Sequence, residues 1–186
     1  MIELADAKLH LRLIDSRDDA DSYTAEDTLI QALIDAAVRY AENHTQARIA
    51  SPTVSKVLDG FPAQDGAIEL PWSPVIAIES LEYVDPEGVE QTLDASTLRL
   101  DTRPIMPTLS PQYGSDWPRT IDEPESVTIS ATVGYETIPP DIRVALLLLV
   151  GHWYENREQV ITGAITSEVP MGVAALLAPY RIHAVG

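Results

Sequence analysis

Residues 146–158 read LLLLVGHWYENRE, an apolar run that passes directly into histidine, aromatic and charged residues. Apolar positions from residue 142 onward recur every three to four residues, which predicts a helix with a buried stripe. Pro139 and Pro140 precede this stretch, and proline is tolerated in a first helical turn. Leu147 and Leu148 lie off the stripe, so we expect the helix to be covered on more than one side. The stripe consists of Ile142, Ala145, Leu146, Leu149, Val150 and Trp153.

The polar end of this helix could belong to an active site or to a subunit interface. His152 and Glu155 are three residues apart, so both could face one metal ion or substrate. A metalloprotease helix needs two histidines four residues apart, whereas His10, His44 and His183 are isolated in the sequence. The cluster of His152, Glu155, Asn156, Arg157 and Glu158 is therefore interpreted as a helix end rather than a catalytic centre.

Other patterns typical of catalytic or cofactor sites fail in the same way. The acidic loop at 15–26 has Arg17 and Ala20 where a calcium loop requires a ligand and a glycine. The sequence contains neither a G-x-S-x-G motif nor a glycine loop of the phosphate-binding type, and it has no cysteine. The sequence thus predicts no catalytic residue, no cofactor and no metal, and we expect that the protein is not an enzyme.

Three more helices are predicted near the two ends of the chain. Residues 4–13 show helical spacing, with polar Lys8 and Arg12 between apolar positions. Thr24 and Asp27 resemble a capping box at the start of a second helix. Residues 171–182 form a short amphipathic helix that Pro179 kinks or ends. The second helix has a stripe wide enough to bury, made of Ile30, Leu33, Ile34, Ala37, Val38 and Ala41.

The middle of the chain predicts strands instead of helices. Ten of the 14 prolines lie between Pro52 and Pro124, which excludes a long helix there. Short alternating runs predict strands at 53–58, 67–70, 75–84, 89–93, 98–101 and 127–133, with a turn at 85–88. The predicted fold class is therefore α+β: a helical core of two N-terminal and two C-terminal helices (1–50 and 136–186) with an inserted, mostly antiparallel small β region (51–135), forming one compact domain.

Composition narrows the choice of partners. The 186 residues carry a formal net charge of −17, which disfavours direct binding to nucleic-acid phosphates. The longest apolar run, 144–150, is far shorter than the ~20 residues that cross a bilayer, so we expect a soluble protein. The segment after residue 140 is close to neutral, and it is therefore the part that loses its water most easily on binding a protein.

An alternative function rests on aromatic residues of the β region. Exposed aromatic rings can stack on sugars, although aromatic residues at strand ends also serve as core or interface anchors. A carbohydrate- or ligand-binding module is therefore the second hypothesis. Its candidate residues are Trp72, Tyr83, Tyr113, Trp117 and Tyr135.

Several segments, taken in order, are similar to the neck adaptor, or head–tail connector, proteins of long-tailed bacteriophages and prophages. They are LADAKLHLRL (4–13), EDTLIQALIDAAVRYAENHT (26–45), LPWSPVIAIESLEYVDPEG (70–88), YGSDWP (113–118), VTISATVGYETIPPDIRVALLLLVGHWYENRE (127–158) and VPMGVAALLAPYRI (169–182). Together they extend over nearly the whole chain. One departure is local: the glycine that the family often carries after the second helix, in a T-G-R run, is replaced here by Gln46-Ala47.

The resemblance implies a structural virion protein without catalytic residues. It implies a dodecameric ring beneath the portal protein, which joins the capsid to the tail, binds a stopper, tail-completion or other neck protein, and surrounds the channel through which genomic DNA passes without sequence-specific binding. The expected location is the virion neck, and the host cytoplasm during assembly. The helix end then becomes a candidate interface, because Trp153, Tyr154 and Arg157 are residue types enriched at interface centres.

The near-neutral C-terminal segment is the candidate portal contact. Its apolar stripe and its charge lead us to expect that residues 171–186 can be deleted with loss of portal binding and with the fold intact. The candidate contact residues in this segment are Leu176, Leu177, Tyr180 and Arg181.

Overall fold

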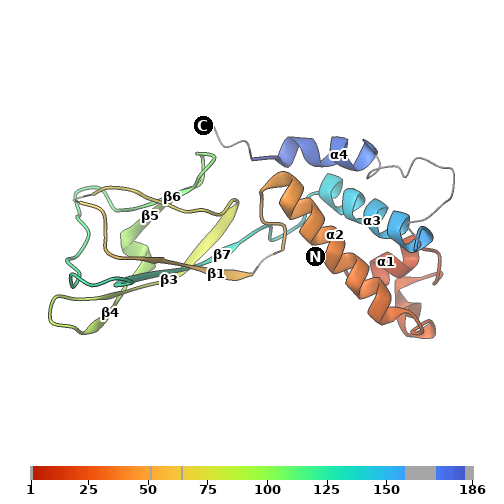
Figure 1. Ribbon diagram of the computed structural model, residues 1–186, viewed down its shortest axis with the longest axis horizontal. Coiled ribbons are helices and arrows are strands. Elements are labelled where there is room, and N and C mark those ends of the chain that lie inside the picture. Colours follow the sequence, from red (N-terminus) through yellow and green to blue (C-terminus); the bar gives the residue numbers. More distant parts are fainter. Residues whose placement is uncertain (1, 51, 64, 158–170, 183–186) are drawn as a thin grey trace. The chain divides into compact units, whose positions relative to one another are not determined.

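The computed structural model describes residues 2–50, 52–63, 65–157 and 171–182. Helices and antiparallel sheets are both present, so the α+β class is confirmed (Figure 1). The chain divides into a helical unit, formed by Met1–Ile49 and Thr137–Ile182, and a β unit that begins at Ala50 and runs to Glu136. Within the described residues, no helix is both long enough and apolar enough to span a membrane.

The described part of the helical unit contains four α-helices and two 3-10 helices. The α-helices are α1 (Leu4–His10), α2 (Asp27–Thr45), α3 (Pro140–Glu155) and α4 (Met171–Leu177), and the 3-10 helices are η1 (Arg17–Ser22) and η3 (Ala178–Tyr180). Helix α3 packs against α1, α2 and α4. The buried stripes predicted for α2 and α3 meet in this core, and Ile30, Ile34, Ile142, Leu146 and Leu149 are almost completely buried there.

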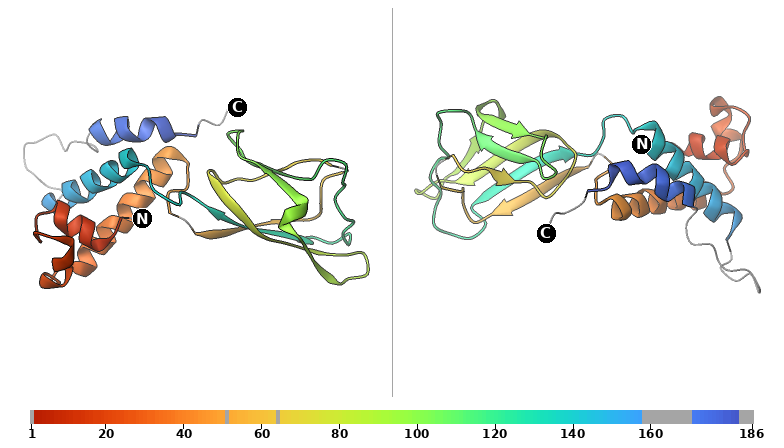
Figure 2. Two further views of the ribbon diagram at one scale, coloured as in Figure 1. Left: turned by 180° about the vertical axis from the view of Figure 1, so that it is seen from behind. Right: turned by 90° about the horizontal axis from the view of Figure 1, so that it is seen from above.

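Helices α2 and α3 run antiparallel, as the views in Figure 2 show. At one end, the backbone N–H of Ile182 donates to the carbonyl of Thr45 at 2.7 Å, and the Tyr180 hydroxyl donates to Asp141 at 3.4 Å. The end of α2 and the start of α3 therefore lie beside the same C-terminal segment. At the other end, Glu26, just before α2, accepts a hydrogen bond from Tyr154 near the end of α3.

One prediction about the helices is wrong, and another holds only in part. Helix α2 is not capped by the Thr24 hydroxyl, because the helix starts at Asp27 and its N-cap residue is Glu26, which makes no side-chain cap bond. Helix α3 packs against three other helices, but its cover is incomplete on the outer side, where Leu147 is half-buried and Leu148 remains 38% exposed. The solvent side of α3 thus has apolar residues that the core of the chain does not use.

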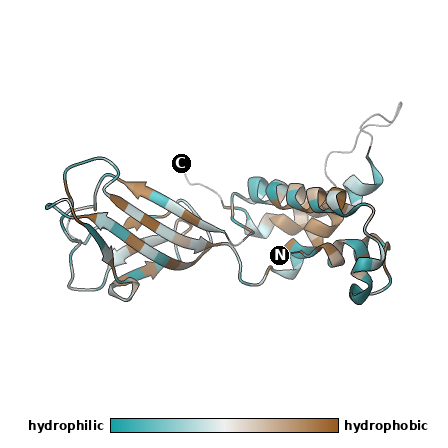
Figure 3. Ribbon diagram, turned by 90° about the horizontal axis from the view of Figure 1, so that it is seen from below, coloured by the Kyte–Doolittle hydropathy of each residue, from teal (hydrophilic) through white to brown (hydrophobic). Residues whose placement is uncertain are grey.

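The described residues of the β unit form two antiparallel sheets. The first has the order β1 (Thr53–Leu58), β7 (Val127–Val133), β3 (Val75–Val84), β4 (Glu90–Leu93). The second has the order β2 (Ile68–Glu69), β6 (Thr108–Pro111), β5 (Leu98–Asp101), with the 3-10 helix η2 (Ala95–Thr97) before β5. Alternate residues of β7 are buried, as period-2 spacing predicts. The alternation of apolar and polar residues along these strands is visible in Figure 3.

Local sequence is sufficient to predict the turn at 85–88, but it is not sufficient to predict strand β6. The predicted hairpin turn forms: Gly88 has φ +80°, and its N–H donates to the carbonyl of Asp85 at 2.9 Å. The Asp85 carboxylate accepts hydrogen bonds from the backbone of Val89 and Glu87 and from Gln91. Strand β6 was not predicted, since its sequence TLSP contains serine and proline and only its pairing with β2 and β5 defines it.

Gln46 occupies a position that favours glycine. It follows α2 with φ +59°, in the left-handed region, where a side chain costs energy. The replacement Gln46→Gly is therefore expected to raise the free energy of unfolding by about 0.5–1 kcal/mol, measured by urea denaturation. The control Gln46→Ala keeps the positive φ and should give no gain. Equal stability of the two variants would contradict this account.

Candidate interface residues

The Tyr154 and Arg157 side chains bind Glu26 of their own chain. The hydroxyls of Tyr154 and Tyr23 both donate to one carboxylate oxygen of Glu26, the latter at 2.8 Å. Arg157 forms an ion pair with the other oxygen at 2.7 Å, and its guanidinium carbon lies 4.5 Å from the centre of the Tyr154 ring. We call these four residues the Glu26 cluster. Its geometry fixes the end of α3 to the start of α2.

The Glu26 cluster perturbs the acidity of its members. Hydrogen bonds from Tyr154, Tyr23 and Arg157, in that order of importance, lower the pKa of Glu26 to about 2. The hydrogen bond to Glu26 is likewise the main cause that raises the pKa of Tyr23 to about 12. Tyr154 and Arg157 each make their own hydrogen bond to Glu26, and this bond raises the pKa of each of them. Glu26 is thus held in its charged form where the start of α2 meets the end of α3.

This cluster predicts a defined sensitivity to acid. Because the pKa of Glu26 is lower in the folded chain than in the unfolded chain, its stabilising contribution is complete above pH ~4.5 and is lost as the pH falls toward ~2. In Glu26→Gln, we expect a lower melting temperature at pH 7 and a smaller decline between pH 4.5 and 2. The matched control is Glu155→Gln, at an exposed carboxylate. A decline in Glu26→Gln as steep as in the wild type would contradict the assignment.

Trp153 belongs to an aromatic contact between α3 and α2. Trp153 is half-buried, and its ring packs edge to face against the ring of Tyr40. The two ring centroids are 6.3 Å apart, and the angle between the ring planes is 82°. Tyr40 in turn stacks on His44 with a centroid distance of 6.0 Å. Trp153 therefore contributes to the helix packing and also presents part of its ring to solvent.

The C-terminal segment contributes both core and surface. Val173 and Leu177 are fully buried, whereas Leu176 and Tyr180 are half-buried and Arg181 is exposed. Burial, followed by the charge and hydrogen bond of Asp141, raises the pKa of Tyr180. The expectation that residues 171–186 can be removed with the fold intact is wrong, because removal takes away two core side chains of α4.

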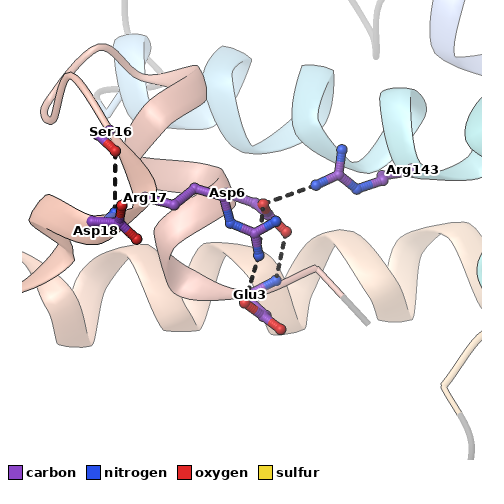
Figure 4. A network of polar contacts seen from close by, with 6 residues as sticks. All are labelled: Glu3, Asp6, Ser16, Arg17, Asp18 and Arg143. Atoms are coloured by element: carbon purple, nitrogen blue, oxygen red, sulfur yellow. Dashed lines mark hydrogen bonds and ion pairs between the residues drawn. The ribbon is translucent and has the colours of Figure 1, made fainter.

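A second polar network was not predicted from the sequence. Figure 4 shows Asp6 between two arginines, with Arg143 of α3 at 2.8 Å and Arg17 of η1 at 3.2 Å. The Asp6 carboxylate also accepts the backbone N–H of Glu3 at 3.3 Å, and Arg17 binds Glu3 at 2.6 Å. Burial opposes the charged form, but the hydrogen bonds from Arg143 and Glu3 and the two positive charges outweigh it and lower the pKa of Asp6. This network joins α1, η1 and α3.

The acidic loop at 15–26 also serves the fold. Its 3-10 helix η1 is capped by Ser16, which accepts the N–H of Asp18 at 3.3 Å. The carbonyl of Ala20 accepts a hydrogen bond at 2.7 Å from Lys8, whose side chain also pairs with Asp27 at 2.6 Å. No group of three or more potential metal ligands occurs among the described residues. Glu158 and His183, considered above with the metal hypotheses, lie outside the described residues.

Most of the aromatic residues behind the carbohydrate hypothesis pack inside the β unit. Trp72 and Trp117 are each 8% exposed and belong to its core. Trp117 donates its indole N–H to the carbonyl of Gly66 at 2.7 Å and stacks on Phe61 at 4.7 Å between ring centres. Tyr113 is exposed, but a single ring does not form a stacking platform. The structure therefore favours core roles for the two tryptophans.

Comparison with protein families shows that part of the chain resembles a known family. Residues 1–91 match the phage gp6-like head-tail connector protein family. This confirms the resemblance drawn from the sequence. Comparison with curated proteins gave no match.

Solved structures extend the likeness to the whole chain. A chain in the neck of an empty gene transfer agent particle, computed with C6 symmetry, is 27% identical, with a TM-score of 0.73 over 99% of this chain and 91% of that chain. A chain in the virion of a native gene transfer agent particle is 28% identical, with a TM-score of 0.72 and the same coverage. A chain in a native neck with C12 symmetry shares the fold, at 24% identity, with a TM-score of 0.68 over 100% of this chain and 93% of that chain.

Proposed function

We propose that this chain is a structural protein of a virion neck, a head–tail connector that joins the capsid to the tail. The observation that carries the proposal is the likeness to a neck chain of a gene transfer agent over 99% of this chain and 91% of the other. The match of residues 1–91 to the head-tail connector family supports the same role. The protein acts through shape and contacts rather than through reactive groups, and it is not an enzyme.

Ring assembly follows from the same likeness. The solved necks that contain the similar chains were computed with C6 and C12 symmetry. Such symmetry suits a closed ring of copies with other virion proteins above and below. In our proposal the ring has twelve copies and lies between the portal protein and a stopper, tail-completion or other neck protein. Its location is the virion neck, with assembly in the host cytoplasm. Each copy contributes a helical core (1–50 and 136–186) of two N-terminal and two C-terminal helices, with an inserted β region (51–135).

The charge of the chain suits a channel for DNA. A ring that surrounds the exit channel must let the genome pass without binding it, and a net charge of −17 per copy repels phosphates. We infer that part of the acidic surface lines the channel. A reconstruction of the neck tests this: acidic side chains are expected in the lumen, and a basic or neutral lumen would contradict the idea.

The interface residues proposed from the sequence divide into two groups. Trp153, Tyr154 and Arg157 lie at the end of α3, where the Glu26 cluster holds two of them in place. The second group belongs to the C-terminal segment and consists of Leu176, Leu177, Tyr180 and Arg181. Leu177 is buried and anchors this segment in the core of the helical unit. We propose that the end of α3 lies near a subunit boundary and that Leu176, Tyr180 and Arg181 contact the portal.

The portal contact is tested with surface substitutions rather than a truncation. The double variant Leu176→Asp/Arg181→Glu is expected to weaken co-sedimentation with the cognate portal at least about tenfold, because it places charge in the apolar contact and reverses the sign of its cation. Its melting temperature should stay close to that of the wild type. The matched control is Val89→Asp, at an exposed valine of the β unit. Undiminished portal binding by the double variant would contradict the assignment.

A further inference from the structure

The outward face of α3 has an apolar ridge formed by Val144 and Leu148. Val144 is 47% exposed and Leu148 is 38% exposed. Because they are four residues apart on a helix, their side chains adjoin. At 100° per residue, they project from the side opposite the buried stripe of Ile142, Leu146 and Leu149. We call Val144 and Leu148 the α3 ridge. In the described part of the helical unit, α1, α2 and α4 leave it in contact with solvent.

The outward face of α2 has a complementary shape. Ala32 and Ala36 are exposed there, and their short side chains make a low surface. Leu29, which is 37% exposed, borders this surface on one side, and the exposed Arg39 borders it on the other. We call these four residues the α2 face. A neighbouring helix can approach closely where alanines separate larger side chains.

The α3 ridge and the α2 face point in opposite directions. Helices α2 and α3 pack on each other through their buried stripes, so their solvent sides lie on the two flanks of the helical unit. Copies related by rotation around a ring need two different surfaces on opposite flanks, and a contact between a surface and itself gives only a dimer. The helical unit therefore has the arrangement that a ring contact requires.

The two surfaces also match in position and in charge. Rotation about a ring axis does not change the height of a residue, so in a ring whose axis runs along the antiparallel helix pair, facing residues occupy the same level along that pair. Leu148 and Ala36 both lie near the middle of their helices. The exposed carboxylates of Asp141 and Glu155 flank the α3 ridge on the same side of the helix, whereas Arg39 supplies a positive charge on the α2 face.

We propose that the α3 ridge of one copy packs on the α2 face of the next copy, and that repetition of this contact closes the ring. The inference rests on the proposed neck function and names the pair of surfaces that builds it. Leu148 lies at the centre of the contact, and Arg39 approaches Asp141 of the adjoining copy at its edge.

Cysteine pairs test the contact directly, because the chain has no cysteine of its own. In purified particles, Ala36→Cys/Leu148→Cys treated with a short bismaleimide is expected to give a ladder of covalently linked copies in denaturing electrophoresis. Each single variant should give no ladder. The matched control pair is Ala36→Cys/Val57→Cys, which uses a valine exposed to the same extent as Val144, and it should also give none.

The outcomes separate the inference from the function. Particles that contain the chain but give no ladder would overturn the contact alone, and so would cross-linked dimers from Leu148→Cys by itself, which would indicate a twofold contact. Absence of the wild-type chain from particles would overturn the neck function and the contact with it. As a second variant, Leu148→Glu is expected to reduce incorporation roughly tenfold with an unchanged circular dichroism spectrum, whereas Val57→Glu should incorporate normally. Normal incorporation of Leu148→Glu would overturn the contact.

Discussion

The replacement Leu149→Ala is expected to lower the free energy of unfolding by about 2–5 kcal/mol. Leu149 is fully buried between the helices, so its removal loses apolar contacts and leaves a cavity in the core that joins α3 to its neighbours. The measurement is urea denaturation followed by circular dichroism at 222 nm, where the helical unit dominates the signal.

The neighbouring leucine supplies the matched control. Leu148→Ala removes the same atoms from the same helix, but Leu148 lies on the α3 ridge and is 38% exposed, whereas Leu149 is fully buried. Its effect on the isolated chain should be below about 1 kcal/mol. Equal losses of unfolding free energy for the two variants would show that the two faces of α3 do not differ in burial. That result would contradict the assignment of Leu149 to the core and of Leu148 to the exposed α3 ridge.

The second large effect is expected at Lys8. This side chain is 1% exposed, and it binds the Asp27 carboxylate at 2.6 Å and the Ala20 carbonyl at 2.7 Å. Lys8→Ala should lower the free energy of unfolding by about 2–3 kcal/mol, because it leaves both partners without their cation. This expected loss is smaller than the loss for a fully buried ion pair, because water reaches part of the Asp27 side chain.

Two further variants isolate the origin of that effect. Lys8→Met keeps most of the apolar stem and removes only the charge, so a loss close to that of Lys8→Ala would assign the effect to the ion pair. Arg103→Ala breaks the exposed pair between Arg103 and Asp101 in the β unit and should change stability little. A loss at Lys8 no larger than at Arg103 would contradict the role of Lys8 in joining α1, η1 and α2.

Local patterns were sufficient for the regular elements. The stripe from Ile30 to Ala41 was predicted as a buried helix face because its period of 3.6 residues follows from helix geometry alone. Strands β1, β3, β5 and β7 coincide with predicted alternating runs. Strand β6 was missed because two neighbouring strands define it, and the sequence of four residues has no period to detect.

Contacts between distant segments could not be predicted in this way. Lys8 interrupts an apolar pattern and was interpreted as polar, yet the loop at 15–26 folds over it and supplies a carbonyl. Asp6 meets Arg143 only after α1 and α3 pack together. The same limit applies to the candidate interface: the sequence singled out Tyr154 and Arg157 by residue type, but only the folded chain shows that Glu26 binds both.

Image reconstruction of the neck of particles that carry this chain tests the central claim most directly. We expect density for copies of the chain in one closed ring between capsid and tail, with the α3 ridge of each copy against the α2 face of the next. Particles with a complete neck from which the chain is absent would contradict this claim.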